Sequence, residues 1–527
     1  MISPREQPRL RDWIGFMSMV VGMFMAILDI QIVSSSIAEI QAGLAASPDE
    51  AAWVQTSYLI AEIVMLPLSG WLSRALSTRV LYVGSALGFT LASALCASAH
   101  SLGEMILWRA LQGFIGGAMI PTVFATAFLM FPPRYRLRVQ VLVSLCATLA
   151  PTIGPTLGGW LTDSFSWHWV FLVNLVPGVA VAGAVWALMD IDRPDLALLR
   201  RLDWIGLVSM AAFLGSLEYV LEEGNRWDWF DDPDIRRFAL LSAAGCAVFL
   251  WRMLTAEDPL VDLRPLGDRN FLMCYLLMGV IGVGLYGAVY IVPLFFAEVR
   301  GFNSYQIGVA MLATGAVQFF TGPISGRVAA HVDMRYMATF GLICFALSCW
   351  WMASLTNLSG TWEIVGPQGL RGFALMFLFV PVNQLCFGTL PPHMLKNAAG
   401  LFNTMRNLGG AIGIALLGTL LTNRTQFHWL HLAEQVTWSR PSVPGQIAQM
   451  TRLLEQKMGP MGAQAVLPEL AKLVEREALV QAFNDVLLAM ALCFVVAIPL
   501  SLLLRRPGPS PSQREAARGE APREPAH

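Results

Sequence analysis

The sequence predicts an all-α membrane protein with about 14 transmembrane helices, since each span needs about 20 mostly apolar residues. Of its 527 residues, 56% are hydrophobic and 13% are charged, and the mean hydropathy is +0.57. A soluble chain carries about 25% charged residues, and no soluble core could bury this much apolar sequence. The apolar runs are continuous rather than alternating, which favours helices over barrel strands.

The first apolar run is expected to be an uncleaved span, because it is too long for a signal peptide and no small-residue cleavage site follows it. Thirteen further spans are expected after it. The spans are expected to start near Trp13, Ala51, Val80, Glu104, Val139, Val170, Asp203, Phe238, Phe271, Ile307, Met337, Val365, Ala398 and Gln481.

Positive charge orients these spans, because Lys and Arg concentrate in cytoplasmic loops. Arginines, or Lys396 before the thirteenth span, occupy every second connection, whereas the short loops at 38–50, 99–103 and 163–168 contain neither Lys nor Arg. With an even number of spans, both termini are expected in the cytoplasm and the chain in the inner (plasma) membrane. One long extracytoplasmic loop is expected at 424–480, either as a solvated cap or as a docking surface.

Several classes of function are disfavoured. The formal net charge of −1 argues against a nucleic-acid partner, which would need a concentrated basic face. The eight cysteines lack metal-ligand spacing, so neither a metal site nor a disulfide framework is expected. The chain has no Gly-Lys-Ser/Thr phosphate loop, which disfavours ATP as the energy source.

An internal repeat indicates how the spans are grouped. "RALQGF" (109–114) in the fourth span matches "QGLRGF" (368–373) in the twelfth. The second and tenth spans also end alike, so the simplest arrangement is six helices, two inserted helices and six more, as in transporters built from parallel repeats. The expected units are a six-helix bundle at 1–190, two inserted helices at 191–265, a second six-helix bundle at 266–506 and a disordered cytoplasmic tail at 507–527.

Charged residues inside spans mark candidate functional positions, because each costs at least ~3 kcal/mol near the bilayer centre. They are Asp29, Glu62, Arg109, Glu218, Arg371 and Arg406. Asp29 and Arg109 are expected at the same depth, where they either form a permanent ion pair or take part in proton coupling. A carboxyl group ionises less readily when desolvated and more readily beside an arginine, so alternation between these environments would make a proton switch.

The other intramembrane polar residues leave alternatives open. Glu62 has no neutralising partner on its own helix, so it is either protonated or faces a cavity, and it is a candidate to bind a proton or another cation. Glu218 is a further candidate for proton coupling. Glu218 lies nearer the end of its span and could be only interfacial, and Arg406 could reach cytoplasmic headgroups. Intramembrane amides such as Asn403 and Asn407 are expected to hold helices together.

The stretch "APTIGPTLGG" (150–159) combines helix breakers inside the fifth span. They are Pro151, Gly154, Pro155, Gly158 and Gly159. The small residues allow close approach of another helix, and freed carbonyls are tolerated in lipid only where protein or water satisfies them. This stretch is therefore expected to be buried and bent.

These motifs resemble those of a known family. "GPTLGG" resembles the fifth-helix antiporter motif of the major facilitator superfamily, and "RALQGFIGGAMIPT" resembles its fourth-helix motif. "LDIQIVSSSI" (28–37) resembles the first-helix motif of its 14-helix drug:proton antiporters of EmrB/QacA type. The long loop before the last span is similar to that of EmrB-type pumps. The resemblance implies the major facilitator fold, proton coupling by Asp29 and Arg109, and a sealing bend at 151–159.

One motif departs from the superfamily pattern. In "GWLSRALSTR" (70–79), Arg74 and Ser77 stand where an aspartate and a glycine are usual, so the aspartate of the gating salt bridge is missing. Eight residues are predicted to act in gating or helix packing. These are Gly70, Arg74, Arg79, Gln112, Gly113, Arg371, Asn403 and Arg406.

Together these observations predict proton-coupled efflux of hydrophobic or amphipathic compounds, driven by the proton motive force without a cofactor. The alternative is a dedicated transporter of one metabolite, lipid or siderophore-like compound on the same fold, because fold does not fix the substrate. An enzyme is not expected, since no catalytic constellation is present. The EmrB resemblance implies a periplasmic adaptor and an outer-membrane channel as partners.

Overall fold

The structure, a computed structural model, describes residues 7–256, 258–436, 440, 442–459 and 462–505. The predicted tail at 507–527 lies outside these residues. The described part is helical without strands, which confirms the expected all-α class. Thirteen segments in this part are long and apolar enough to cross a membrane. The remaining expected span is α16 (Met334–Met352), which packs along α17 and α20.

The N-terminal helices, defined as α1 to α10, supply six of the thirteen spans. Two of these spans are interrupted, between α6 and α7 and between α9 and α10. The bounds are α1 Leu10–Ser35, α4 Trp53–Leu76, α5 Thr78–Ala97, α6 Leu102–Gly116, α7 Met119–Met130, α8 Pro133–Ser164, α9 His168–Leu172 and α10 Leu175–Leu188, with short helices α2 Ile37–Gly43 and α3 Pro48–Ala51.

The C-terminal helices, defined as α14 to α20, follow the inserted pair α12 (Trp204–Glu223) and α13 (Pro233–Thr255). Their bounds are α14 Arg269–Glu298, α15 Ser304–Ala329, α17 Thr361–Gly388, α18 Leu395–Gln435, α19 Ser442–Met458 and α20 Gly462–Leu502. Short helices lie in four connections: α11 Ala197–Arg200 before α12, η1 Trp229–Asp231 between α12 and α13, η2 Arg264–Gly267 before α14, and η3 Pro392–Met394 before α18.

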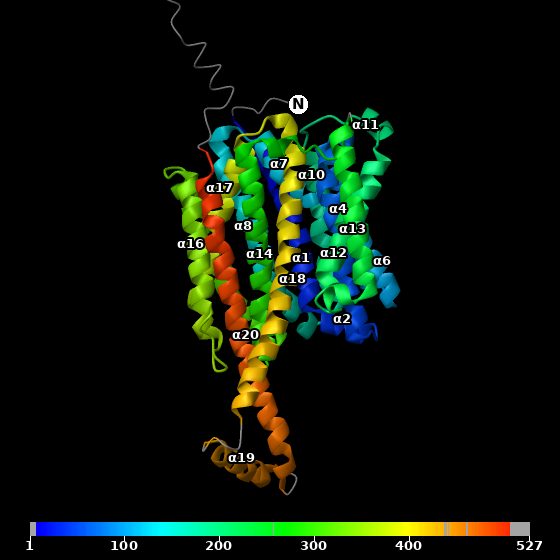
Figure 1. Ribbon diagram of the computed structural model, residues 1–527. Coiled ribbons are helices and arrows are strands. Elements are labelled where there is room, and N and C mark those ends of the chain that lie inside the picture. Colours follow the sequence, from blue (N-terminus) through cyan, green and yellow to red (C-terminus); the bar gives the residue numbers. More distant parts are fainter. Residues whose placement is uncertain (1–6, 257, 437–439, 441, 460–461, 506–527) are drawn as a thin grey trace, which may run out of the picture.

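Several helices, among them α12, α14 and α15, start where a polar side chain accepts a hydrogen bond from one of the first backbone donors. Asp203 caps α12 by accepting a hydrogen bond from the backbone of Gly206 at 3.0 Å. The same carboxylate accepts two hydrogen bonds of 3.0 Å from Arg252 of α13, which joins the inserted helices into a hairpin. In Figure 1 this hairpin lies at the edge of the bundle, beside α4.

The internal repeat is visible in the packing of equivalent glycines. A Cβ atom on Gly113 would collide with the backbone carbonyl of Tyr58, and one on Gly372 would collide with that of Thr314. Each contact joins the fourth membrane span of a set to the second span of the same set. The helices are α6 and α4 in the N-terminal set, and α17 and α15 in the C-terminal set. The two sets therefore share a helix contact that only glycine permits, in line with the sequence repeat.

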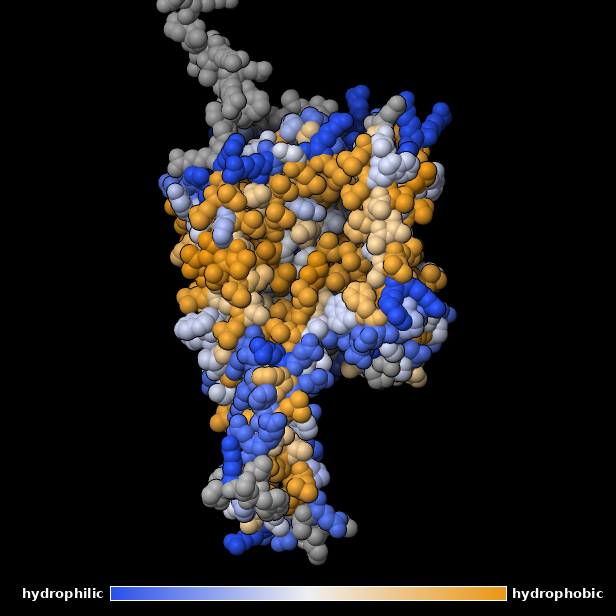
Figure 2. All heavy atoms as spheres, in the orientation of Figure 1, coloured by the Kyte–Doolittle hydropathy of each residue, from blue (hydrophilic) through white to orange (hydrophobic). Residues whose placement is uncertain are grey.

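The bundle has two distinct ends. We name the end where α1 begins and α20 finishes the terminal end, and the opposite end the far end (Figure 1). Figure 2 shows an apolar band across the visible face of the bundle, bordered by polar residues at both ends. The segment 424–480, expected as a loop, is largely helical, because α18 and α20 continue beyond the bundle and α19 lies at the tip.

Candidate functional site

An enclosed polar cluster surrounds Asp29 among the N-terminal helices. Arg109 Nη1 donates to Asp29 Oδ2 at 2.7 Å, and both side chains are fully buried. The amides of Gln112 and Asn174 donate to Asp29 Oδ1 at 3.2 and 2.7 Å. The same two amides donate to Ser93 Oγ at 2.7 and 3.3 Å. The expected pairing of Asp29 with Arg109 is therefore present, within a larger network.

The guanidinium of Arg109 is held from several directions. Its Nε donates to the carbonyl of Val54 at 3.1 Å, and its Nη1 also donates to Gln112 Oε1 at 2.6 Å. The guanidinium carbon lies 4.2 Å from the ring centroid of Tyr58, a cation–π distance. Arginine does not lose its proton in proteins, so Asp29 is the member of this pair whose charge can change.

A second cluster lies one helical turn away on α4, because Glu62 follows Tyr58 by four residues. Asn407 Nδ2 of α18 donates to Glu62 Oε2 at 3.2 Å. Asn407 Oδ1 accepts hydrogen bonds of 3.3 Å from Arg406 and from Tyr286 Oη. The amide of Asn407 thus links a carboxylate of the N-terminal helices to a cation of the C-terminal helices.

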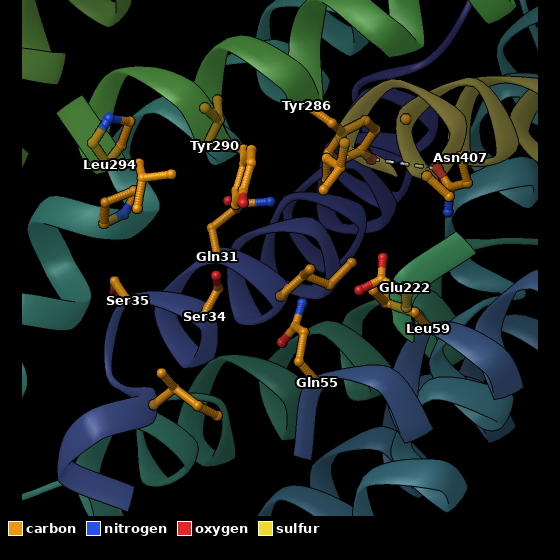
Figure 3. Close-up of a pocket in the computed structure, with 18 of the residues that line it drawn as sticks. Gln31, Ser34, Ser35, Gln55, Leu59, Glu222, Tyr286, Tyr290, Leu294 and Asn407 are labelled. Carbon is orange, nitrogen blue, oxygen red and sulfur yellow. Dashed lines mark hydrogen bonds between the residues drawn. The ribbon is translucent and has the colours of Figure 1, made fainter. Parts of the chain in front are cut away.

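A cavity of about 560 Å³ opens beside Glu62, between α1, α4, α8, α12, α14, α15 and α18. Carboxylates line it at Glu62 on α4 and at Glu218 and Glu222 on α12. Figure 3 shows Tyr286, Tyr290 and Leu294 of α14 on the wall facing α1 and α4, and Gln31, Gln55 and Asn407 also line the space. Glu62 thus faces a cavity, and Glu218 is buried in its wall rather than only interfacial.

The cavity lies in the far half of the bundle. A smaller hollow of about 210 Å³ shares Ser34, Gln55 and Glu222 with it and extends to Arg226, in the connection that follows α12. At the terminal end, aromatic rings close the space between the two sets of helices. Phe128 of α7 lies 5.3 Å from Phe387 of α17, centroid to centroid.

An ion pair across the two sets of helices accompanies this closure. Lys396 Nζ contacts Asp192 Oδ2 and donates to the carbonyl of Ser73 at 3.0 Å. Asp192 also accepts hydrogen bonds from the backbone and hydroxyl of Thr78 at 2.9 and 3.0 Å. We call Asp192 and Lys396 the terminal latch. It links the two sets although the usual motif aspartate is absent.

Of the candidate gating residues near this latch, Gly70 packs against the backbone of Lys396, and neither Arg74 nor Arg79 is hydrogen-bonded to Asp192 or Lys396 among the described residues. A Cβ atom on Gly70 would lie 2.8 Å from the backbone carbonyl of Lys396, so α4 and α18 approach closely here. Arg79 donates to the carbonyl of Met189 at 3.4 Å, a contact within the N-terminal helices. Arg74 Nε has no hydrogen-bond partner in the part of the chain that the structure describes.

The Pro/Gly stretch of α8 packs against α1. A Cβ atom on Gly154 would collide with the side chain of Gln31, and one on Gly158 would lie 2.8 Å from the carbonyl of Ile32. All five motif residues are buried, and Pro155 lines the cavity. Helix α8 continues through both prolines and also contacts α15. The stretch therefore lies between the N-terminal and C-terminal helices, next to the cavity.

The three remaining candidates are buried among the C-terminal helices. Arg371 Nη2 donates to Thr314 Oγ1 at 3.2 Å, and its Nη1 has no partner among the described residues. Asn403 donates to the carbonyl of Ala399 on its own helix at 2.9 Å. Arg406 is only 1% exposed, so the alternative that it reaches cytoplasmic headgroups is wrong.

Sequence reasoning missed several participants. Asn407 was expected only as helix packing, and Asn174 and Asp192 were not singled out. Asn174 follows "WHWVFLV" in a tight connection, where no pattern reveals that its amide reaches Asp29. Glu222 could have been predicted from the sequence to lie beside Glu218, because residues four apart share a helix face.

Together, the fold, the enclosed charged pair and the cavity between two sets of helices define a membrane transport protein. A family profile described as Major Facilitator Superfamily matches residues 19–414. The chain is 40% identical over 499 residues to the colistin resistance protein EmrB of Acinetobacter baumannii, covering 95% of this chain and 97% of the relative. It is 30% identical to the multidrug export protein EmrB of Escherichia coli K12, covering 92% and 93%. The chain therefore belongs to the major facilitator superfamily, among its EmrB-type members.

Two further comparisons extend this result. The fatty acid resistance protein FarB of Neisseria gonorrhoeae is 27% identical, covering 93% of this chain and 96% of the relative. The solved structure of the human organic anion transporter MFSD10 superposes with a TM-score of 0.57 at 13% identity, covering 94% of this chain and all of that one. At this identity the structural likeness shows the shared fold alone.

Proposed function

We propose that this protein exports hydrophobic or amphipathic compounds in exchange for protons, by alternating access. The observation that carries the proposal is the enclosed Asp29–Arg109 pair, since Asp29 directly precedes Ile30 and Gln31, which line a cavity between the two sets of helices. The names of two EmrB relatives, a multidrug export protein and a colistin resistance protein, support export as the direction.

Proton binding would drive the conformational change through Arg109. Protonation of Asp29 removes the countercharge from a buried guanidinium that keeps its own charge. The hydrogen bonds of Gln112 and Asn174 to Asp29 would also weaken, because a neutral carboxyl is a poorer acceptor. The cluster joins α1, α6 and the start of α10, so its rearrangement would shift how these helices pack.

The proton motive force would supply the energy, and no cofactor is required. An entering proton gains about 2.3 kcal/mol per 100 mV and about 1.4 kcal/mol per pH unit. One proton can therefore support a gradient of several hundred-fold when both forces act. The protein would act as a transporter and not as an enzyme.

We place the chain in the inner membrane, embedded in the lipid bilayer, with both termini in the cytoplasm. The arginine-rich connections, such as 134–138 and 193–201, support this orientation. The projection formed by α18, α19 and α20 would then extend into the periplasm. Its position suits contact with a periplasmic adaptor protein, which would lead to an outer-membrane channel.

A second candidate function is dedicated transport of a single compound, such as a lipid. The observation that favours it is the apolar wall of the cavity, formed by residues such as Val289, Leu294 and Ile307. The relative named fatty acid resistance protein FarB is consistent with such a substrate class. Drug sensitivity of a deletion strain separates the two, because a multidrug exporter protects against several unrelated compounds.

The direct test uses inverted membrane vesicles with an imposed pH gradient and a pH-sensitive dye. Addition of a lipophilic drug should release protons through the wild type, and Asp29→Asn should abolish this release. Asp163→Asn, which changes an exposed acid on α8, is the matched control and should behave as the wild type. Equal signals from wild type and Asp29→Asn would remove Asp29 from the coupling and make Glu62 the next residue to test.

A further inference from the structure

Among the described residues that line the cavity, the charged side chains are all carboxylates. Glu62, Glu218 and Glu222 contribute to the wall, and none of the described lining residues is Lys, Arg or His. Glu62 is 1% and Glu218 is 3% exposed. Glu62 Oε1 and Glu218 Oε2 have no hydrogen-bond partner among the described residues. Each of these buried carboxyl groups therefore has an oxygen without a hydrogen-bond partner at the wall of the cavity.

The inserted helix α12 supplies two of these three carboxylates. Glu218 and Glu222 are four residues apart and so share one helix face. Helix α12 packs against α4 and α18, one from each set of helices, and this places that face on the cavity. The neighbouring Glu223 does not line the main cavity. It accepts a hydrogen bond from Thr56 at 3.3 Å and pairs with Arg226 at 3.5 Å.

The wall contributed by α14 carries no charge and is largely aromatic and aliphatic. Tyr286, Tyr290 and Leu294 present two aromatic rings and an aliphatic side chain to the same space (Figure 3). Aromatic faces accommodate both apolar groups and cations. The cavity volume, about 560 Å³, lies within the range of small-molecule sites. The space suits a molecule with a hydrophobic body and a positively charged group.

We propose that the cavity selects amphipathic organic cations, and that α12 determines this specificity through Glu218 and Glu222. The inference deepens the proposed function, since it takes the cavity to be the transport site. A cation at the α12 face gains attraction to two carboxylates, and an anion of equal size meets their repulsion. Helix α12 is thus a wall of the binding site and not only a spacer between the two sets of helices.

The test compares two ions of the same size and opposite charge, tetraphenylphosphonium and tetraphenylborate. Equilibrium binding is measured on the purified full-length protein in lipid nanodiscs, without a pH gradient. We expect the wild type to bind tetraphenylphosphonium at least tenfold more tightly than tetraphenylborate. Glu218→Gln and Glu222→Gln should each weaken tetraphenylphosphonium binding about tenfold, as expected for loss of one charge-assisted contact.

Glu223→Gln is the matched control, because it removes an adjacent carboxylate that does not line the main cavity, and it should leave binding unchanged. The inference is overturned if the wild type binds the two ions with equal affinity or does not bind tetraphenylphosphonium. It is also overturned if both Glu218→Gln and Glu222→Gln bind tetraphenylphosphonium as tightly as the wild type. A loss in Glu223→Gln as large as in the α12 variants would overturn it too. If Glu218→Gln does not fold, the less buried Glu222 carries the comparison.

Failure of this inference can be told apart from failure of the proposed function. Asp29 does not line the cavity, so Asp29→Asn should retain tetraphenylphosphonium binding while it loses drug-induced proton release. Binding that ignores charge, together with intact proton release, would refute the role of α12 alone. Charge-selective binding without any proton release in the wild type would refute the antiport mechanism alone.

Discussion

Breaking the terminal latch should open the terminal end of the molecule. The perturbation is Asp192→Asn, which removes the carboxylate that contacts Lys396 and accepts two hydrogen bonds from Thr78. The side chains of Asp192 and Lys396 are 11% and 13% exposed, so the pair lies between an exposed pair and a fully buried one. Exposed pairs contribute about 0.2–1 kcal/mol and loss of a buried partner costs about 3–5 kcal/mol.

Asp192→Asn should therefore destabilise the state in which the terminal end is closed by an intermediate amount, about 2 kcal/mol. This corresponds to a shift of about 30-fold toward terminal-end opening, since 1.4 kcal/mol is a factor of ten. Amide hydrogen exchange at the ends of α4 and α18, where Gly70 meets Lys396, should accelerate by a similar factor. The acceleration reports opening of this contact, because protected amides exchange from the open state.

Asp333→Asn is the control, since Asp333 pairs with Arg335 at 2.7 Å within the C-terminal helices. Asp192→Asn combined with Lys396→Met should cost less than the sum of the single changes, because the two residues contact each other. The reasoning is refuted if exchange in α4 and α18 is unchanged by Asp192→Asn. It is also refuted if Asp333→Asn accelerates exchange there equally.

Three further changes test other features. Ser77→Gly should raise the melting temperature, because Ser77 has φ of +78° and a side chain costs about 1–2 kcal/mol in this region, more than the few tenths lost with its helix cap. Gly158→Leu should lower the melting temperature by disrupting the contact of α8 with α1, whereas Gly183→Leu, with nothing near its Cβ position, should not. Asn407→Ala should reduce transport at least tenfold, while Asn403→Ala, which loses a bond to its own helix, should have a smaller effect. The first expectation is contradicted if Ser77→Gly lowers the melting temperature. The second is contradicted if Gly158→Leu and Gly183→Leu change the melting temperature equally. The third is contradicted if Asn407→Ala and Asn403→Ala transport equally well.

Much of the fold could be predicted because lipid imposes a simple rule on sequence. A span must satisfy its backbone internally and present about 20 apolar residues, so each one is visible as a run. The repeated motif predicted two similar sets of helices, and the equivalent contacts of Gly113 and Gly372 agree with that grouping. The continuation of α18 and α20 beyond the bundle was not apparent, since polar sequence at a span end is compatible with either a loop or a helix.

The candidate site was predicted only in part. Asp29 and Arg109 could be paired because burial of one charge in lipid demands a partner at similar depth. Asn174 and the terminal latch could not be found in this way. The latch joins residues 204 positions apart, Asp192 in a polar connection and Lys396 at the first turn of α18, where charge is common and carries no signal of burial.

The unbroken length of α18 couples the cavity mechanically to the projection at the far end. This helix runs from Lys396 in the terminal latch, past Asn407 beside Glu62, to Gln435 outside the bundle. Its 41 residues form a rod of about 60 Å, given a rise of 1.5 Å per residue. A tilt of about 10° about the terminal end would displace the tip by about 10 Å. Helix α18 can therefore transmit a movement at the latch or the cavity to the projection, where it would displace a protein bound to α19.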